Sequence, residues 1–377
     1  MQIVKFGHNK LNYLEGILEK YKPSNILLLT GKSSYINSGS KETLLPFLNH
    51  YKHIQYSDFE ENPKIEDVES VVNIFNNNNC DFIIAIGGGS VMDMAKLVNY
   101  FAKKEAPFKD KFNDSLTKSA SYPMVAIPTT SGTGSEATHF AVVYSKGIKY
   151  SIADNNLLPN YVFLLPHLTY NNPNYLSAVT GLDAFAQAIE SYWSVNSTDE
   201  SKEYSKKAIN LIWNNLETII NNNSVAARDK LMEASYIAGK AINITKTTAP
   251  HALSYGFTSI CGLPHGHAVS LFIPYIIQKN IDVTEANCND KRGVKYVKNN
   301  LLELSKMVNS NINNFAQDIH DFFLKCHIEI SFSSLNIDET IFNKALNNLS
   351  QERLSNNPVI LEIDKLSDIF KSRYNNA

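Results

Sequence analysis

The chain has 377 residues, of which 44% are hydrophobic and 19% charged, and its formal net charge at pH 7 is -2. This length favours two domains over a single core. The near-neutral charge argues against nucleic-acid binding, which needs a basic surface. Neither a signal peptide nor a membrane-spanning run is evident, and the four cysteines form no C-x-x-C pair. We therefore expect a reduced, cytoplasmic protein with no nucleic-acid or membrane partner.

Short apolar runs alternate with helical segments in the first part of the chain. We predict strands over 26–30, 53–57, 81–86 and 124–127, and helices over 40–49, 68–75 and 91–101. This alternation is typical of a parallel sheet covered on both faces. Residues 1–167 are therefore predicted to form an α/β, Rossmann-like dinucleotide-binding domain.

Helical periodicity dominates from about Leu168 onward, and strand patterns become rare. The helical stretches are 182–193, 200–220, 226–242 and 301–326. We therefore predict that residues 168–377 form an all-α domain that binds metal and substrate.

Two glycine-rich loops follow predicted strands. The first, Gly87-Gly88-Gly89-Ser90, leads into a predicted helix, so its backbone can approach a phosphate at a helix N-terminus. It could equally be a tight strand-to-helix turn. The second, Ser131 to Ser135, follows the next strand. Two such loops at neighbouring strand ends predict a phosphate or dinucleotide site.

Four polar residues further along the chain could form a metal site. Asp183 and Gln187 are four residues apart, so they share one face of a helix. His251 and, fourteen residues later, His265 could complete a cluster of two oxygens and two nitrogens. Such a cluster suits a divalent transition metal with one position open for substrate.

Several motifs make the chain similar to the iron-dependent (group III) alcohol dehydrogenases. They are GGGSVMDMAK (Gly87 to Lys96), PTTSGTGSEAT (Pro128 to Thr138), GLDAFAQAIESY (Gly181 to Tyr192) and LPHGHA (Leu263 to Ala268). The resemblance covers nearly the whole chain and implies a dehydroquinate synthase-like fold and a homodimer. Three further stretches resemble the phosphonoacetaldehyde reductase branch: residues 30–39, 136–144 and 242–255.

The resemblance also implies roles for single residues. The implied dinucleotide contacts are Gly88, Gly89, Ser90, Asp93, Thr129, Thr130, Ser135 and Lys149. The implied metal ligands are Asp183, His251 and His265, with Fe²⁺ or Zn²⁺ as the expected ion.

Gln187 departs from the family pattern, which has a histidine at this position. A glutamine offers a neutral carbonyl oxygen in place of imidazole. Three interpretations remain open: Gln187 binds the metal through this oxygen, it holds a metal-bound water, or the site has lost its metal.

Three other residues are candidates for proton transfer or substrate contact. Tyr255 stands where many family members have a histidine, and it either relays a proton to the product or packs in the core. His267 could act as a relay or support the metal ligands. His139, after the second glycine loop, could face the substrate.

The turn after the first strand bears on the choice of cofactor. Gly31 occupies the position where an acidic residue would grip the ribose 2′-hydroxyl of NADH. Lys32 and Ser33 could instead bind a 2′-phosphate, so the sequence favours NADPH. If Gly31 is only a turn residue, another acid could select NADH.

These features predict a metal-dependent aldehyde reductase, with phosphonoacetaldehyde as the proposed anionic substrate. Lys246 and Thr247, just before His251, could bind the anionic tail, although Lys246 could also be a solvated lysine at a helix end. The alternatives are a reductase for neutral aldehydes or diols such as lactaldehyde or 1,3-propanediol, a lyase-type cyclase, and a non-catalytic dinucleotide-binding protein.

Overall fold

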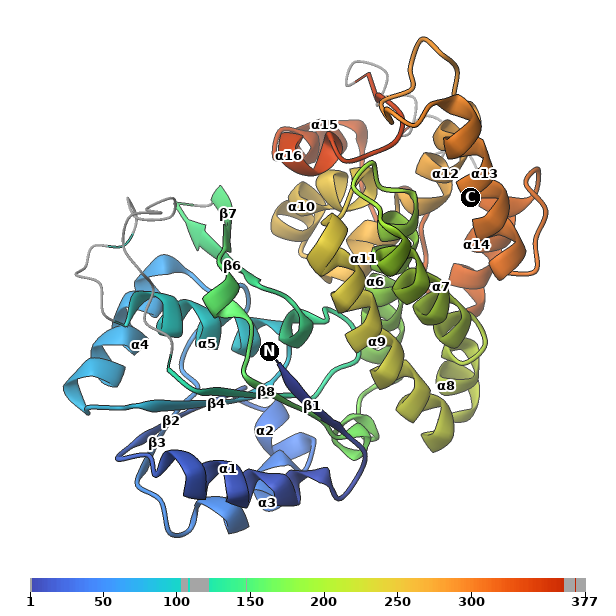
Figure 1. Ribbon diagram of the computed structural model, residues 1–377. Helices are drawn as coiled ribbons and strands as arrows, with labels where there is room; N and C mark the ends of the chain where they lie inside the picture. The colour runs from blue at the N-terminus through green and yellow to red at the C-terminus, as the bar shows by residue number, and fades with distance from the viewer. Residues whose placement is uncertain (1, 103–107, 109–121, 147, 363–369, 371–377) are drawn as a thin grey trace. The chain divides into compact units, whose positions relative to one another are not determined.

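The structure, a computed structural model, describes residues 2–102, 108, 122–146, 148–362 and 370. It divides into two compact units, Met1–Asn172 and Pro173–Ala377 (Figure 1). The first unit is α/β and the second helical, which confirms the predicted fold class. Among the described residues, no helix is both long enough and apolar enough to cross a bilayer.

The first unit is built on a parallel sheet of six strands in the order β1-β8-β5-β4-β2-β3. The strands are β1 (Ile3–Phe6), β2 (Ile26–Thr30), β3 (His53–Tyr56), β4 (Phe82–Gly87), β5 (Met124–Pro128) and β8 (Tyr161–Leu164). An antiparallel pair, β6 (Phe140–Ser145) and β7 (Ile148–Ala153), stands apart from this sheet. Every residue of β2, β4 and β5 is buried, because helices cover both faces of the sheet.

The helices of the first unit are α1 (Tyr13–Tyr21), α2 (Ser34–Asn37), α3 (Ser40–Leu48), α4 (Ile65–Asn77) and α5 (Gly89–Phe101). Apolar residues of α1 and α3 share a core with one face of β2, β4 and β5. The helices α4 and α5 lie on the opposite face of the sheet (Figure 1).

The strand order places three predicted site segments at one edge of this sheet. Strand β3 lies on one side of β2 and strand β4 on the other, so the order in which the chain adds parallel strands switches from one side of β2 to the other. Strands β2, β4 and β5 are parallel and in register, with Thr30 beside Ile86 and Gly87 beside Pro128. Their carboxyl ends therefore bring Gly31, Gly88 and Thr129 to a position where α/β sheets commonly bind ligands.

The second unit is organised around α6 (Asn174–Trp193), most of which is buried. Its other helices are α7 (Asp199–Trp213), α8 (Leu216–Asn222), α9 (Val225–Thr245), α10 (Ala249–Cys261), α11 (His265–Ser270), α12 (Ile273–Ile281), α13 (Val294–Met307), α14 (Phe315–Lys325), α15 (Glu339–Leu346) and α16 (Gln351–Leu354). Helices α7, α8, α9, α11 and α13 contact α6. A helix enclosed in this way can place polar side chains where water is excluded.

Two predicted helical stretches are wrong in one respect, because each contains two helices. Residues 200–220 are divided between α7 and α8 at Asn214 and Asn215, and the Asn215 amide bonds the Leu211 carbonyl at 2.8 Å. Residues 301–326 are divided between α13 and α14. Here Asn309 adopts φ 56°, a left-handed conformation that asparagine tolerates at the end of a helix.

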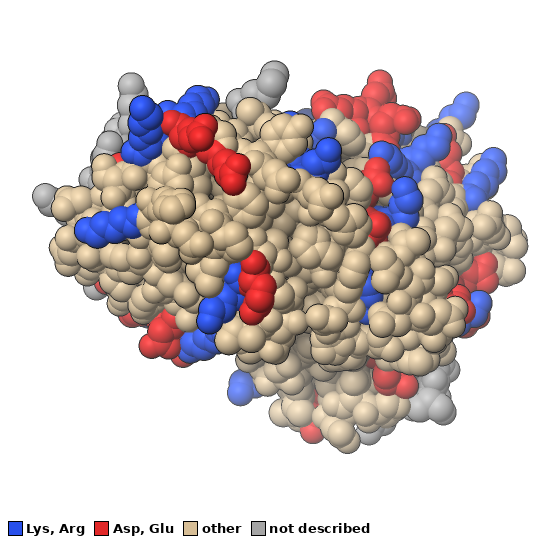
Figure 2. Space-filling model, turned by 90° about the horizontal axis from the view of Figure 1, so that it is seen from below, with Lys and Arg blue, Asp and Glu red and all other residues tan. Residues whose placement is uncertain are grey.

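Charged side chains are distributed over the surface without a single dominant sign on the face that Figure 2 shows. Lysines and arginines lie among aspartates and glutamates there. This distribution agrees with the formal net charge of -2.

Candidate metal centre and dinucleotide loops

Three of the predicted metal ligands converge in the second unit. Asp183 comes from α6, His251 from α10 and His265 from the first position of α11. One ligand atom of each lies within 4.8 Å of the others. His251 Nε2 is 3.2 Å from Asp183 Oδ1, and the two imidazole rings are 5.2 Å apart between centroids. The donors therefore come together from segments that are far apart in sequence.

Gly266 allows α11 to approach α6 closely enough to form this cluster. A Cβ atom on Gly266 would lie 1.9 Å from the Val179 carbonyl oxygen and 2.9 Å from Asp183 Cβ. Both are impossible contacts, and the first is with backbone. His265 can therefore lie beside Asp183 only if residue 266 is a glycine.

Glu190, which is not among the predicted site residues, contacts the His251 ring nitrogen that does not face Asp183. Its buried carboxylate accepts hydrogen bonds from Thr248 N at 2.9 Å, Thr248 Oγ1 at 3.1 Å and His251 N at 3.3 Å through Oε1. Its Oε2 accepts a hydrogen bond from His251 Nδ1. This bond leaves His251 Nε2 directed toward Asp183, as metal-binding histidines require. The spacing 183, 187, 190 on one helix face was the available signal.

The charges of this cluster reinforce one another. Burial alone lowers the pKa of His251, but Glu190 and Asp183 outweigh it and raise the pKa to about 10. Burial raises the pKa of Asp183, yet His251 and His265 bring it below its usual value. Two carboxylates beside two imidazoles make a buried environment that favours a cation.

Gln187 lies one turn after Asp183 on α6 and is also buried. Its side chain hydrogen-bonds Asp183, which contributes to the lowered pKa of that carboxyl. Because a carboxylate only accepts hydrogen bonds, the Gln187 amide nitrogen is the donor. The amide oxygen is then the atom that Gln187 could offer to a metal or a water.

Tyr255 and His267 have different surroundings. The Tyr255 ring stacks on His265 with centroids 5.8 Å apart and an interplanar angle of 21°. His267 is buried and bonded through both ring nitrogens, to Tyr175 Oη at 2.9 Å and to the Glu329 carbonyl. Since a carbonyl must accept, His267 Nε2 carries the proton, and burial lowers the pKa of this histidine.

Lys246 and Thr247 form the connection between α9 and α10. Lys246 has φ 59° and ψ 179°, a conformation that is nearly restricted to glycine. Its ammonium group pairs with Glu352 of α16, and the two side chains are 42% and 56% exposed. Thr247 is buried, and its carbonyl accepts a hydrogen bond from Asn356 at 3.0 Å.

In the first unit, the two glycine loops touch each other. Gly88 caps α5 and Gly89 is its first residue. A Cβ atom on Gly89 would lie 2.8 Å from Thr133 Cγ2 of the second loop. Ser90 Oγ accepts a hydrogen bond from Asn62 N at 3.1 Å.

Three predicted dinucleotide contacts cluster beside α5. Asp93 Oδ1 accepts a hydrogen bond from Ser135 Oγ at 2.6 Å, and its Oδ2 accepts one from Val142 N at 3.1 Å. Burial raises the pKa of Asp93, against opposing contributions from Lys96 and Lys149. Asp93 and Ser135 are therefore in direct contact, and the charge of Lys149 acts on the Asp93 carboxyl.

The remaining predicted residues lie at the ends of the strands. Thr129 is buried and its N–H bonds the Gly87 carbonyl at 2.9 Å, while Thr130 packs beside Gly88. A Cβ atom on Gly31 would lie 2.1 Å from Ser34 Oγ, so the turn after β2 is tight.

Two more predicted side chains belong to this edge or to its neighbourhood. Lys32 pairs with Asp58 at 2.9 Å on an exposed surface, and Ser33 occupies the N-cap position of α2 without a capping hydrogen bond from its side chain. His139 directly precedes β6, and its carbonyl accepts a hydrogen bond from Asp154 N at 3.0 Å.

Comparison with known families accounts for both units. The family described as "Iron-containing alcohol dehydrogenase" matches residues 2–166, and "Fe-containing alcohol dehydrogenase family, C-terminal" matches residues 177–374. The chain belongs to the iron-containing alcohol dehydrogenase family.

Relatives of this dehydrogenase-family chain differ in their substrates and length. It is 30% identical over 345 residues to aldehyde-alcohol dehydrogenase 2 of Entamoeba histolytica, which covers 85% of the chain but only 40% of that protein. It is 29% identical to phosphonoacetaldehyde reductase of Streptomyces viridochromogenes, over 78% of the chain and 76% of that protein. The crystal structure of sulfoacetaldehyde reductase from Bifidobacterium kashiwanohense with NAD⁺ has a TM-score of 0.88 at 27% identity, covering 100% of this chain and 98% of that one.

The residues of the cluster fit the metal that the name of the iron-containing alcohol dehydrogenase family implies. Asp183, His251 and His265 provide one oxygen and two nitrogen donors. Because Glu190 accepts a hydrogen bond from His251 Nδ1, Nε2 is the nitrogen that a neutral His251 would offer to a metal. A mixed set of this kind is suited to a divalent transition metal.

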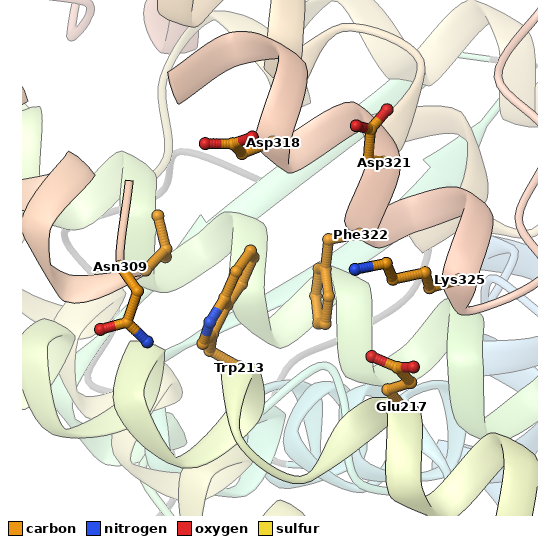
Figure 3. Close-up of a pocket in the computed structure, with 8 residues that line it drawn as sticks. Trp213, Glu217, Asn309, Asp318, Asp321, Phe322 and Lys325 are labelled. Carbon is orange, nitrogen blue, oxygen red and sulfur yellow. The ribbon is translucent and has the colours of Figure 1, made fainter. Parts of the chain in front are cut away.

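A separate hollow in the second unit contains none of the predicted site residues. Its volume is about 340 Å³, and it is lined by Trp213, Glu217, Val308, Asn309, Asp318, Asp321, Phe322 and Lys325. Figure 3 shows the Trp213 and Phe322 rings near its centre, with Asp318 and Asp321 on one side and Glu217 on the other. Asp318 accepts a hydrogen bond from Ser310, and Asp321 accepts one from Gln317.

Glu136, in the second loop, should make stability depend on pH. Burial raises the pKa of this carboxyl from 4.5 to about 7, against opposition from Lys96. Between pH 4.5 and about 7, the carboxyl is therefore protonated in the folded state but ionised in the unfolded state. The stability that this protonation contributes is complete below pH 4.5 and is lost as the pH rises to about 7. The loss amounts to about 3 kcal/mol.

We expect Glu136→Gln to remove this dependence. Urea unfolding at pH 5 and pH 8 measures it, and the difference between the two pH values should shrink in the variant. Equal differences in variant and wild type would show that Glu136 does not carry the effect.

Proposed function

We propose that this chain is a metal-dependent, nicotinamide-linked aldehyde reductase whose substrate is a short anionic aldehyde such as phosphonoacetaldehyde. The observation that carries the proposal is the buried convergence of Asp183, His251 and His265 in a chain of this family. The names of two relatives support the substrate class, because phosphonoacetaldehyde and sulfoacetaldehyde are both two-carbon aldehydes with an anionic group.

The chain's own residues would bind and orient the reactants. Asp183, His251 and His265, with Gln187 as the predicted fourth ligand, would hold the metal, and Glu190 would keep a metal-bound, neutral His251 in the required tautomer. A bound divalent metal supplies Lewis acidity toward a carbonyl oxygen.

Proton transfer and cofactor orientation fall to other groups. Backbone N–H groups of Gly88 to Ser90, at the start of α5, would bind a pyrophosphate. The phenol of Tyr255, stacked on His265, is the proposed proton relay to the product oxygen.

We further propose NADPH as the preferred cofactor. The turn after β2 has Gly31 in place of an acid, so residue 31 itself carries no charge that would repel a 2′-phosphate. Lys32 is the adjacent cation, although it is paired with Asp58. Because that ion pair is exposed, little free energy is lost when Lys32 leaves Asp58 to bind a phosphate.

Loss of reduced-nicotinamide absorbance with purified protein tests the proposal. Phosphonoacetaldehyde and sulfoacetaldehyde would be compared with propanal and lactaldehyde, each with NADPH and NADH, before and after chelation and metal restoration. A higher kcat/KM for the anionic aldehydes that is lost on chelation supports the proposal. Absence of turnover with every aldehyde, in metal-loaded protein, would refute it.

We expect Lys246 to discriminate between anionic and neutral aldehydes. Lys246→Ala should raise KM for phosphonoacetaldehyde by about tenfold, because a charge-assisted contact is lost. Its KM for propanal should stay unchanged. Glu352→Gln is the matched variant, since it frees the Lys246 ammonium from an exposed pair worth at most about 1 kcal/mol.

The two variants are expected to change KM for the anionic aldehyde in opposite directions. Glu352→Gln should lower KM for the anionic aldehyde by up to about fivefold, the factor that corresponds to this free energy. If both variants change KM equally for anionic and neutral aldehydes, Lys246 does not contact the tail.

A neutral short-chain aldehyde or diol is the second candidate substrate. The Lys246–Glu352 ion pair favours it, since the positive charge nearest His251 in sequence is already balanced by a carboxylate. The same assay separates the candidates, because this one predicts a higher kcat/KM for lactaldehyde or propanal.

A further inference from the structure

Lys96 is the last residue of the GGGSVMDMAK motif, and the proposed function leaves it without a role. It lies in α5 and its side chain is completely buried. Four oxygens lie within hydrogen-bond distance of its ammonium group, which has three hydrogens to share among them: the Ser135 carbonyl, Ser135 Oγ at 2.9 Å, Thr138 Oγ1 at 3.0 Å and the Phe140 carbonyl at 2.9 Å. All four acceptors belong to the segment that continues the second glycine loop.

Asp93, one turn earlier on α5, holds the same segment from a neighbouring position. It accepts hydrogen bonds from Ser135 Oγ at 2.6 Å and from Val142 N at 3.1 Å. Ser135 Oγ thus donates to Asp93 and accepts from Lys96. Together the two side chains fix residues 135–142 along the flank of α5.

The same helix begins in the first glycine loop. Gly88 caps α5 and Gly89 is its first residue, where a Cβ atom would collide with Thr133 at 2.8 Å. One rigid helix therefore carries the first loop at its N-terminus and holds the second loop at its side. The contacts of Lys96 and Asp93 therefore join the segment after the second loop to the helix that begins in the first loop.

Lys96 lies among polar and charged groups in a buried place. The direct partners of its ammonium group are uncharged oxygens, and burial lowers the pKa of Lys96 to about 8, against opposing contributions from the carboxyl of Asp93 and the buried carboxyl of Glu136. Removing one member of such a buried charged cluster is costly in stability. A buried cation with several directional bonds also fixes one arrangement of the backbone around it.

We propose that Lys96 is a positioning residue for the dinucleotide, which acts by holding the second glycine loop in register with the first. The inference rests on the proposed function, because it assumes that the two loops bind a nicotinamide dinucleotide. Lys96 itself is enclosed and does not touch the ligand; Ser135 and its neighbours transmit the effect.

Lys96→Met, which preserves length and removes the charge, tests this role. We expect the Kd for NADPH and NADH, measured by calorimetric titration of the metal-loaded protein, to rise at least tenfold. The KM for aldehyde and the bound metal content should stay within twofold of wild type. A Kd within twofold of wild type would overturn the inference.

A second buried cation serves as the matched control. Arg228 of the other unit is also buried, and it bonds Ser177 Oγ at 2.8 Å and Asn223 Oδ1 at 3.0 Å. Arg228→Met should lower the urea midpoint and leave the dinucleotide Kd unchanged. If it raises the Kd as much as Lys96→Met does, the effect is general destabilisation and the inference is wrong.

Thr138→Val removes one acceptor of Lys96 without changing the lysine, and it decides the question if Lys96→Met does not fold. Its dinucleotide Kd should rise about threefold, as expected for one weakened hydrogen bond. An unchanged Kd here would count against the inference. Wild-type protein that binds no dinucleotide would instead refute the proposed function, and this inference with it.

Discussion

Gly266→Ala is expected to abolish both metal binding and aldehyde reduction. The added Cβ would lie 1.9 Å from the Val179 carbonyl oxygen and 2.9 Å from Asp183 Cβ, so α11 must move away from α6. His265 begins α11 and moves with it. A displacement of about 1 Å at a reacting centre costs on the order of a hundredfold in rate, and forcing a group into a packed core costs about 1–3 kcal/mol.

Metal content by atomic emission and kcat/KM for the preferred aldehyde measure this effect. Gly262→Ala is the control in the same connection, because nothing lies within 4 Å of its Cβ position although its φ is 68°. It should cost about 1 kcal/mol in stability and leave the metal in place. If Gly266→Ala retains full metal content, close approach of the two helices is not what forms the site.

Glu190→Gln should weaken metal binding about 10–100-fold, the usual effect of removing the partner of a metal-bound histidine. Glu190 accepts hydrogen bonds at both oxygens, from Thr248 and the backbone at one and from His251 Nδ1 at the other. A glutamine has only one acceptor atom. Either the N-terminus of α10 loses its partner, or His251 takes the tautomer that protonates Nε2.

Competition with a chromophoric chelator gives the metal Kd for this comparison. Glu303→Gln is the matched control, because Glu303 also partners a residue of α6, the Tyr192 hydroxyl, but stands outside the cluster. It should leave the metal Kd unchanged. Equal metal affinity in wild type and Glu190→Gln would mean that His251 needs no such partner.

The sequence predicts the fold class because its periodicities are strong where burial is complete. Strands β2, β4 and β5 are fully buried, and the sequence predicts each of them as an apolar run, whereas β8 is equally buried and is not among the predicted strands. Strand β1 is half exposed and β6 alternates between buried and partly buried residues, so neither forms such a run. The break between α7 and α8 depends on side-chain bonding by asparagines, which hydrophobic periodicity does not detect.

Residue types in the sequence predict three members of the candidate metal site but not the carboxylate that supports them. Asp183, His251 and His265 are recognisable ligands, and they do converge. Glu190 cannot be distinguished in the sequence from other acidic residues, because its role depends on a contact with His251 of α10. The pairing of Lys246 with Glu352 joins residues 106 positions apart, and no local pattern encodes it.

The three predicted metal ligands come from three helices, so metal binding would also affect how the chain folds. Asp183 and His251 are 68 residues apart, so an ion held between them closes a long loop of chain. The unfolded chain has no preformed set of donors, so binding favours the folded state by mass action and the melting temperature of this unit should rise with metal concentration. The supply of metal would then set how much of the protein is folded, in addition to how much of it is active.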